Sequence, residues 1–459
     1  MEREIKIKCG SIKGTITDGI LQFRGIPYAK PPVGRLRFCL PEPADSWEGV
    51  YDGTCRHFIE PQRTSNLDRP MGVTRLHQSE DCLTLSISTP SLEGRLPVAV
   101  WLHGGANCYG GGDLEWYDGA MLAKLANVVV VNINFRLGPF GFLFCPGVNE
   151  ENLSIEDQML ALGWIQENIG SFGGDSQRVT VFGQSAGANS IVHILSRPDS
   201  EGLFGQMILE SPSLGRGNHR LSDAFEIGEA VLHNLGVRAE EKESLWEQLA
   251  KRSADEILTA AEQVPGELYD RYQGMIFKPV KDEWHTPKEA VEAAVREAVR
   301  RKISIVIGMT KEETHAFILE RDLKSLETAA KMQLKRYDLP GQAFALQAAE
   351  MGLPVWKYRF DWSAPKSVFD ACHCLELPFV FGNLDAWDAP MLKGASREEL
   401  CRLRTAIQTY WCEFFRFGTP DPGEWPPYRP DKRLIKCFDN KDNPVAEEPD
   451  YAAFSAVTQ

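Results

Sequence analysis

A short apolar run that ends in a glycine-flanked serine constrains this chain more than any other feature. Residues 178–182 (RVTVF) lead into Gly183-Gln184-Ser185-Ala186-Gly187, and residues 188–196 (ANSIVHILS) have a helical pattern. The two glycines let the backbone turn sharply against its neighbours, so the serine hydroxyl is expected on a strained elbow above the end of a strand. The sequence therefore predicts a strand, a tight turn that presents Ser185, and a helix.

Further strands are predicted at 98–102, 128–133 and 303–307. These runs are short, apolar and rich in β-branched residues, which is typical of strands buried on both faces. A surface helix is predicted over 286–302, with Pro287 in its first turn and a capping box formed by Thr286 and Glu289. Because strands alternate with helices, we expect an α/β fold with a mainly parallel sheet, whose chemistry lies beyond the carboxyl ends of the strands.

Charge and hydropathy exclude several kinds of partner. The 459 residues include 50 basic and 64 acidic side chains, a formal net charge of −14. Phosphate binding needs clustered Lys and Arg, so nucleic acid and anionic membranes are poor candidate partners. No run approaches the ~18 apolar residues of a spanning helix, and the charged start MEREIKIKCG is unlike a signal peptide.

The cysteines favour a reducing compartment. Eleven are scattered singly, an odd number in a chain too long to need disulfides, which predicts free thiols and a cytoplasmic location. Cys372, His373 and Cys374 form a soft-ligand triplet, but consecutive side chains point in different directions and no second cluster completes a tetrahedron. We expect neither a metal nor a cofactor.

A serine nucleophile needs backbone donors for the developing oxyanion, and His103-Gly104-Gly105-Ala106 follows a predicted strand where an α/β-hydrolase carries such a loop. Ala186, directly after the serine, supplies another donor. The alternative for this region is a phosphate-binding loop, because Gly110-Gly111-Gly112 lies just beyond, but no G-K-[ST] sequence or strand-linked GxGxxG accompanies it.

The acid and the base are expected after the serine in the chain. Glu312-Glu313 follows a predicted strand, and the residues leave open which of the two carboxylates acts. The candidate bases are the six histidines beyond Ser185: His193, His219, His233, His285, His315 and His373.

Longer motifs carry a resemblance to a family. They are FRGIPYA (23–29), PPVGRLRF (31–38), SEDCL (79–83), HGGA (103–106), FRLGPFGFL (135–143), FGGD (172–175) and ELPFVFGN (376–383). With these motifs the chain resembles the type-B carboxylesterases of the α/β-hydrolase superfamily, most closely the bacterial para-nitrobenzyl esterases. The likeness runs through most of the length. Because the motifs from 103 to 373 must meet in one site, we expect a single domain over residues 1–459, with helical insertions around the active-site gorge.

The resemblance implies the roles of six residues. Ser185 matches the nucleophile, Glu313 the acid and His373 the base, while Gly105, Ala106 and Ala186 match the oxyanion-hole donors. It implies a serine carboxylesterase that forms an acyl-enzyme intermediate and accepts short to medium acyl esters in a largely apolar cleft. A catalytically silent binding protein on the same scaffold is the alternative. Lactones, thioesters and amides stay open as substrates, and so does the oligomeric state.

The chain also departs from the family. Asn107-Cys108 replaces the usual aromatic residue beside the oxyanion loop, which implies a more polar pocket, and Thr314 replaces the glycine after the acid. Cys82 matches a disulfide position of secreted relatives, but its partner position is Glu60, so Cys82 is expected to be a free thiol. Residues 56–81 contain no Trp, which argues against choline esters as substrates.

Overall fold

The computed structural model describes residues 1–74, 76–238, 243–272, 274–281, 289–421 and 423–453. Within these residues, 13 strands form one sheet in the order β1-β2-β3-β5-β7-β6-β8-β9-β10-β11-β12-β13, with β4 paired to β2. The strands are β1 (Glu2–Ile7), β2 (Gly10–Thr17), β3 (Ile20–Pro27), β4 (Val50–Asp52), β5 (Thr84–Thr89), β6 (Leu96–Leu102), β7 (Val129–Ile133), β8 (Gly174–Gln184), β9 (Gln206–Glu210), β10 (Ser304–Thr310), β11 (Val355–Phe360), β12 (Leu434–Phe438) and β13 (Val445–Glu447).

The middle of the sheet is parallel and its margins are antiparallel. From β7 through β6, β8, β9, β10 and β11 to β12, each neighbouring pair is parallel. The strands β1, β2, β3 and β5 at one margin, and β13 at the other, pair antiparallel with their neighbours along the sheet. The predicted mainly parallel sheet is confirmed, and the strands predicted at 98–102, 128–133, 178–182 and 303–307 correspond to β6, β7, β8 and β10.

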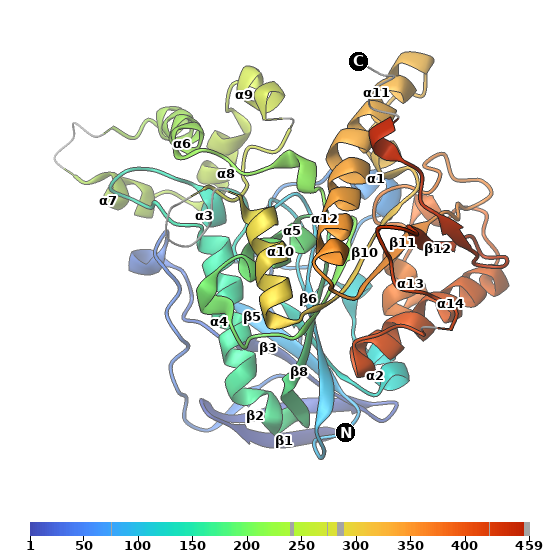
Figure 1. Ribbon diagram of the computed structural model, residues 1–459. Helices are drawn as coiled ribbons and strands as arrows, with labels where there is room; N and C mark the ends of the chain where they lie inside the picture. The colour runs from blue at the N-terminus through green and yellow to red at the C-terminus, as the bar shows by residue number, and fades with distance from the viewer. Residues whose placement is uncertain (75, 239–242, 273, 282–288, 422, 454–459) are drawn as a thin grey trace.

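Helices cover both faces of the sheet (Figure 1). Buried residues of α4, α5, α10 and α12 pack on one face, and those of α2, α13 and α14 pack on the other. The helices are α1 (Asp68–Met71), α2 (Ala120–Ala126), α3 (Gly138–Phe142), α4 (Leu153–Asn168), α5 (Ala186–Leu195), α6 (Leu221–Leu235), α7 (Leu245–Ala250), α8 (Ala254–Glu262), α9 (Gly266–Arg271), α10 (Ala290–Arg301), α11 (Leu323–Gln333), α12 (Leu339–Glu350), α13 (Leu377–Phe381) and α14 (Arg397–Phe417).

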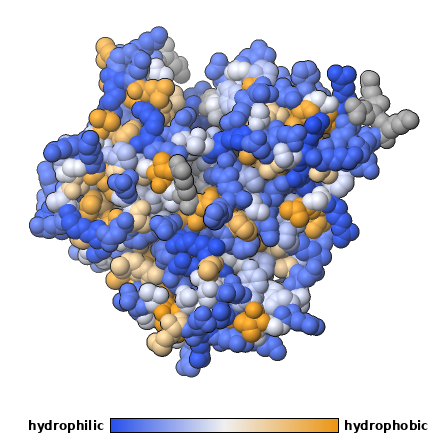
Figure 2. Space-filling view, turned by 180° about the vertical axis from the view of Figure 1, so that it is seen from behind, coloured by the Kyte–Doolittle hydropathy of each residue, from blue (hydrophilic) through white to orange (hydrophobic). Residues whose placement is uncertain are grey.

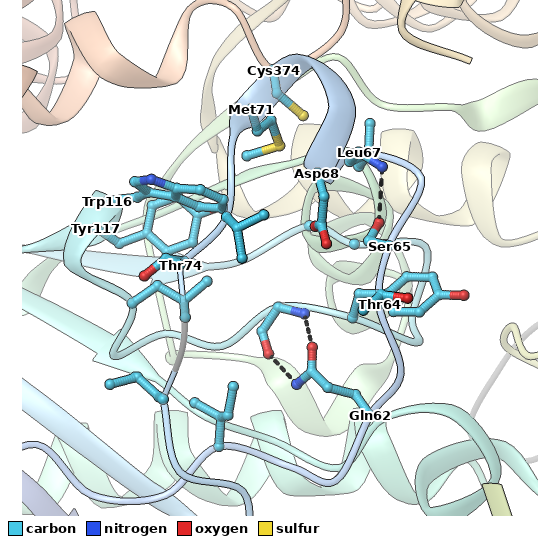
Figure 3. Close-up of a pocket in the computed structure, with 18 of the residues that line it drawn as sticks. Gln62, Thr64, Ser65, Leu67, Asp68, Met71, Thr74, Trp116, Tyr117 and Cys374 are labelled. Atoms are coloured by element: carbon cyan, nitrogen blue, oxygen red, sulfur yellow. Dashed lines mark hydrogen bonds between the residues drawn. The ribbon is translucent and has the colours of Figure 1, made fainter. Parts of the chain in front are cut away.

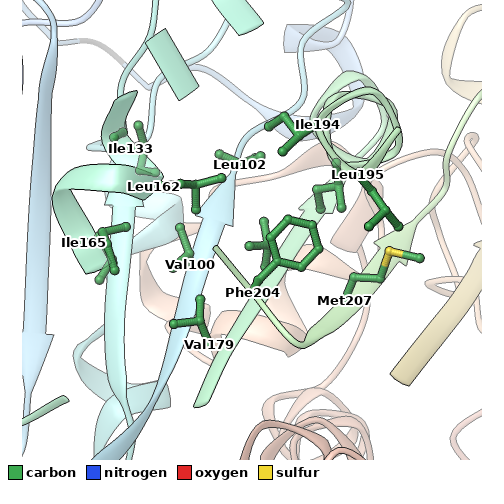
Figure 4. Packing of buried hydrophobic residues seen from close by; sticks show 14 of the residues in the cluster. Val100, Leu102, Ile133, Leu162, Ile165, Val179, Ile194, Leu195, Phe204 and Met207 are labelled. Carbon is green, nitrogen blue, oxygen red and sulfur yellow. The ribbon is translucent and has the colours of Figure 1, made fainter. Parts of the chain in front are cut away.

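Strand β6 shows why the apolar runs are continuous. Val98, Val100 and Leu102 point into the core beneath α4 and α5, where Figure 4 shows Val100 and Leu102 close to side chains of both helices. Ala99 and Trp101 point into the core beneath α14 on the other face. Because successive strand side chains alternate between faces, a strand covered on both sides needs apolar residues at every position.

The segment between β9 and α10 adds helices at one end of the sheet. Helices α6, α7, α8 and α9 gather there in Figure 1. Residues of α6, α8 and α9 form a buried cluster with Phe140 and Phe142 of α3. This cluster lies apart from the two cores that cover the sheet, so the segment forms an additional helical layer.

The helix predicted over 286–302 is present as α10, which begins at Ala290 and ends at Arg301. Its predicted capping residue Thr286 and Pro287 lie outside the described residues. No helix among the described residues is long and apolar enough to cross a membrane. The face of the molecule seen in Figure 2 is largely hydrophilic, with scattered apolar side chains.

Candidate active site

Ser185 lies at the sharp turn between β8 and α5. Its φ of 56° and ψ of −119° place it outside the usual regions for a residue with a side chain. The backbone N–H of Ser185 donates to the carbonyl of Glu210 at 2.9 Å, which holds the turn against the end of β9. The predicted elbow is therefore confirmed as a strand, a strained turn and a helix.

The two glycines of the elbow are required by close backbone contacts. A Cβ atom at Gly187 would lie 2.0 Å from the carbonyl oxygen of Leu102, and one at Gly183 would lie 2.7 Å from the same atom. Since real Cβ atoms do not approach backbone oxygen so closely, any larger residue would push the elbow away from β6. The glycines thus bring the serine close to the loop that follows β6.

That loop, residues 103–106, lies beside the elbow at the end of β6. The His103 ring stacks on Phe135 with centroids 4.4 Å apart, and burial lowers its pKa to about 4, so His103 is a neutral structural residue. Gly105 has a φ of 117°, and a Cβ there would lie 2.0 Å from the Tyr109 carbonyl oxygen. Ala106 also has a positive φ, of 54°.

Three backbone N–H groups are free in this region. Those of Gly105, Ala106 and Ala186 donate no hydrogen bond to any described residue. For Ala186 this follows from its place as the first residue of α5, where the helix offers no acceptor. The predicted oxyanion donors thus have unused N–H groups.

Glu313 and His373 meet in the interior. Glu313 begins the short 3-10 helix Glu313–Ala316 directly after β10, and its Oε2 forms a close contact with His373 Nδ1. The other carboxylate oxygen accepts from the N–H of Thr310 at 2.8 Å. Glu313 is 0% and His373 is 1% exposed. This pairing fixes the ring orientation and leaves Nε2 on the far side of the imidazole.

Glu312 has a different environment. Its Oε2 accepts from the N–H of Ala371 at 3.1 Å, and its Oε1 lies 3.3 Å from the ammonium group of Lys311. It makes no contact with His373 among the described residues. The structure therefore pairs the histidine with the second carboxylate of the Glu312-Glu313 sequence, and Glu312 braces the loop that carries the histidine.

Thr314, in the glycine position after the acid, ties this turn to a neighbouring helix. Its hydroxyl donates to the carbonyl of Ala329 in α11 at 2.9 Å. The side chain at this position is therefore an anchor for the acid.

Gln184 lies between the elbow and the histidine. Its Nε2 is 3.2 Å from His373 Nε2 and 3.4 Å from His373 Nδ1, and the residue is buried. The Ser185 hydroxyl forms no hydrogen bond with a described residue. In unliganded sites the bond between nucleophile and base is often long and tightens only when substrate is bound.

The other candidate histidines have different surroundings. His315 Nδ1 lies 2.9 Å from Asp370 Oδ2, and His219 Nε2 lies 2.9 Å from the carbonyl oxygen of Ile276. Burial lowers the pKa of His193, on α5, to about 4. His233 is in the last turn of α6, and His285 lies outside the described residues. Of the described histidines, His373 is the one that contacts Glu313.

The glycine-rich stretch after the loop has its own partners. The N–H of Gly110 donates to Gln62 at 2.6 Å, and the N–H of Gly112 donates to Asn134 at 2.7 Å. A phosphate cradle needs free N–H groups, so this arrangement disfavours that alternative. Within the described ranges, no three His, Cys, Asp or Glu side chains lie together as a metal site would require.

Two further carboxylates lie beneath the candidate triad, and the sequence motifs did not single them out for the site. Glu376 accepts from the Ser211 hydroxyl at 3.1 Å, and Glu210 accepts from the Trp411 indole N–H at 2.8 Å. Burial raises the pKa of Glu210 to about 8 and the pKa of Glu376 well above its ordinary value. Burial therefore favours the neutral form of both carboxyl groups. Only their three-dimensional placement reveals them, because Glu210 ends an ordinary apolar strand.

A pocket of about 360 Å³ opens beside the elbow and the oxyanion loop (Figure 3). Gly104, Gly105 and Gln184 border it, and its walls come mainly from residues 59–74, 76–78 and 109–117. Polar side chains such as Gln62 and Asp68 line it together with apolar ones, so the expected largely apolar cleft is in fact mixed.

Two departures from the family pattern, at Asn107 and at Cys82, are also clear in the structure. The Asn107 amide does not add a free polar group to this pocket, because its Nδ2 donates to the Phe277 carbonyl at 3.1 Å. Cys82 is a free thiol, as expected, and donates to Glu60 Oε2 at 2.6 Å in the interior. Burial raises the pKa of both Cys82 and Glu60 well above their ordinary values, which favours the protonated form of each.

Comparisons with known proteins agree over almost the whole chain. Residues 1–339 and 332–454 match a model described as the carboxylesterase family. The chain is 38% identical to the para-nitrobenzyl esterase of Bacillus subtilis over 94% of both chains, and 35% identical to a probable N-octanoylanthranilate hydrolase of Rhodococcus erythropolis over 94% of this chain and 97% of the relative. A solved PNB esterase superposes with a TM-score of 0.87 at 33% identity, covering 99% of each chain.

Proposed function

Because the chain belongs to the carboxylesterase family and is a carboxylic ester hydrolase with the α/β-hydrolase fold, we propose that Ser185, His373 and Glu313 are its nucleophile, base and acid. One observation carries the assignment. The buried Glu313 carboxylate contacts one nitrogen of His373, whose ring lies against the residue that precedes Ser185. A histidine oriented by a carboxylate beside an elbow serine is the arrangement that acyl transfer needs.

In the proposed reaction, substrate binding brings the Ser185 hydroxyl within hydrogen-bond reach of His373 Nε2, displacing the Gln184 amide. His373 takes the hydroxyl proton as Ser185 Oγ attacks the ester carbonyl, and Glu313 stabilises the imidazolium. The imidazolium then gives the proton to the departing alcohol, which leaves an acyl-enzyme. Water, deprotonated by His373, releases the acid and restores Ser185.

The N–H groups of Gly105, Ala106 and Ala186 are the proposed oxyanion donors. They border the elbow and make no other hydrogen bond among the described residues. Preorganised donors of this kind stabilise the negative charge that develops on the carbonyl oxygen, typically by about 3–4 kcal/mol each. The positive φ of Ala106 is a backbone cost of this loop conformation, whereas Gly105, which has no Cβ, adopts its positive φ without strain.

The homologues named above are esterases and hydrolases, which favours an enzyme over a silent binding protein. We propose that residues 1–459 act as one catalytic domain, because the residues of the site come from positions 105 to 373 and one sheet carries them. We also propose a cytoplasmic bacterial enzyme of short to medium acyl esters. The free Cys82 thiol, the bacterial relatives and the pocket volume support this.

The test is hydrolysis of para-nitrophenyl acetate and butyrate, with an organophosphate adduct mapped by mass spectrometry. We expect hydrolysis of both esters and an adduct on Ser185. An adduct on another residue, or full activity after labelling is complete, would refute the assignment.

A further inference from the structure

The two margins of the sheet end in strands of different kinds. At one margin, β13 has three residues and lies between Pro444 and Pro449, and a short strand near prolines offers little edge to another chain. At the other margin, β1 has six residues, contains no proline and pairs with β2 without a register shift. Figure 1 shows β1 at the bottom of the molecule, far from the helices at the top. The longer and more regular edge of the sheet is therefore β1.

Alternate residues of β1 point their backbone groups away from β2. The carbonyl of Met1 accepts from the Ile16 N–H at 2.8 Å, and the direction of the backbone groups alternates along an antiparallel strand, so the odd-numbered residues bond to β2. The N–H and C=O groups of Glu2, Glu4 and Lys6 therefore lie along the outer edge. Among the described residues, none outside β1 and β2 bonds to these groups.

The side chains of β1 form a polar face and an apolar face. Glu2, Glu4 and Lys6 are exposed on one face, whereas Ile5 and Ile7 pack on the core on the other. Glu4 and Lys6 form no ion pair with a described residue. The outer edge thus carries one acidic and one basic side chain whose charges are not compensated by a contact within the chain.

A second copy of β1, antiparallel to the first, matches this edge in one register. When Ile5 lies opposite Ile5 of the second copy, Glu4 of each chain lies opposite Lys6 of the other in a hydrogen-bonded pair. The ion pairs then lie on the polar face and the two isoleucines on the apolar face. A shift of two residues in either direction places Glu4 opposite Glu4 or Lys6 opposite Lys6, and like charges directly opposite each other are destabilising.

Charged side chains on an edge strand usually prevent pairing with other chains. In β1 they disfavour the shifted registers, whereas in the register centred on Ile5 the opposite charges attract. The free edge ends at Lys8, whose N–H donates to Asn168 Oδ1 at 3.2 Å. Backbone pairing is therefore limited to the few residues around Ile5, and we expect weak association.

We propose that β1 is an interface for a second copy of this chain, so that two copies join their sheets edge to edge. The interface is independent of the proposed function, because β2, β3, β5, β7 and β6 lie between β1 and the strand that carries the elbow, β8. A short strand pair buries much less than the ~1,600 Å² of a standard interface, so we expect half of the chains to be paired at about 100 μM.

Sedimentation velocity of the native protein at low ionic strength tests the association. Between about 2 μM and about 500 μM, the weight-average mass should rise from that of one chain toward that of two. A native protein that stays monomeric over this whole range would overturn the proposal.

Charge reversal tests the interface itself. Glu4→Lys and Lys6→Glu each place like charges opposite each other, so either variant alone should pair at least about 10-fold more weakly than the native protein. An equimolar mixture of the two variants should pair again, because the lysines of one chain then face the glutamates of the other. The matched control is Glu327→Lys, which makes the same change of charge at an exposed position of α11 and should pair like the native protein.

Two results would place the interface elsewhere and overturn the role of β1. One is undiminished pairing in both single variants, and the other is a mixture that stays monomeric. Circular dichroism shows whether each variant is folded. If either is not, hydrogen exchange of the native protein decides, because the N–H groups of Glu4 and Lys6 should exchange more slowly at high protein concentration than at low concentration. Equal exchange at both concentrations would exclude β1 from the interface.

Discussion

Two neighbouring regions of the molecule are built in different ways. One is the end of the sheet that holds the candidate triad, and the other is the wall of the pocket beside it. Ser185 and Glu313 follow directly from β8 and β10, two strands joined through β9, and the sheet fixes their separation. The pocket wall comes mainly from residues 59–74 and 76–78, and in these described ranges the longest regular element is α1, with four residues. The reacting groups are thus held by the core, while the groups that would choose the substrate are held by loops.

This difference indicates how the two properties can change independently. A residue of the pocket wall such as Asp68 in α1 can be replaced without moving a strand, whereas a change in the elbow or the acid turn affects the core. We expect the largest effects on kcat from substitutions at the end of the sheet.

Ser185→Ala should lower kcat for para-nitrophenyl butyrate by at least about 10³- to 10⁴-fold, because loss of the nucleophile leaves only oxyanion stabilisation and substrate binding. Steady-state kinetics and organophosphate labelling of the purified variant measure this. Ser196→Ala, at the end of the same helix, loses a hydroxyl that donates to the His193 carbonyl and should retain activity. Retained activity in Ser185→Ala would remove the elbow from the mechanism.

Glu313→Gln should reduce kcat by about 10²- to 10⁴-fold, because the amide cannot hold His373 in the required tautomer or stabilise its positive charge. The neighbouring variant Glu312→Gln is the control. Its carboxylate contacts the Ala371 N–H and Lys311, so we expect a change of no more than about threefold. A larger loss in Glu312→Gln than in Glu313→Gln would reverse the assignment of the acid.

Gly105→Ala should reduce kcat by about 10²- to 10³-fold, the usual effect of losing one oxyanion donor. The added Cβ would lie 2.0 Å from the Tyr109 carbonyl oxygen, so the loop must shift. Gly163→Ala, on α4, adds a Cβ with nothing within 4 Å and should be neutral. Circular dichroism and thermal melting show whether Gly105→Ala stays folded. Unchanged kcat in a folded Gly105→Ala variant would show that the loop does not hold the oxyanion.

The strands and the elbow at the end of the sheet could be predicted from the sequence, because the residues that indicate them are neighbours in the chain. The elbow needs glycines two residues to either side of Ser185, and the strands at 98–102 and 303–307 are almost entirely apolar, so the fold class and the candidate nucleophile follow from neighbouring residues. Choosing Glu313 over Glu312, and His373 among the later histidines, needed a family resemblance, since nothing local separates them. In the structure, Glu313 contacts His373, whereas Glu312 contacts the Ala371 N–H.

The pocket wall could not be predicted in this way. Trp116 and Asp68 are far apart in sequence and line one pocket only because two loops meet there. The argument against choline esters considered residues 56–81 alone, whereas Trp116 lines the pocket from another segment. Glu210 was missed as well, because a glutamate that ends an apolar strand is indistinguishable in sequence from one that faces solvent.

The smallest expected effect concerns Glu210, whose replacement tests whether the buried carboxyl group at the end of β9 is neutral. Burial raises its pKa from 4.5 to about 8, so the folded protein holds a proton that the unfolded chain releases. The stabilisation is fully present below about pH 4.5 and is lost as the pH rises through about 8. Glu210→Gln keeps an acceptor for the Trp411 indole N–H and cannot ionise. The stability of the native protein relative to this variant should therefore fall with rising pH, by at most a few kcal/mol.

Urea unfolding of both proteins at intervals from about pH 5 to about pH 9 measures this difference. Glu48→Gln, at an exposed position, serves as the control and should give a difference that does not vary over the same range. A flat difference for Glu210→Gln would mean that Glu210 is ionised in the folded protein at every pH tested. The end of β9, where the Glu210 carbonyl accepts from the Ser185 N–H, would then carry a permanent negative charge.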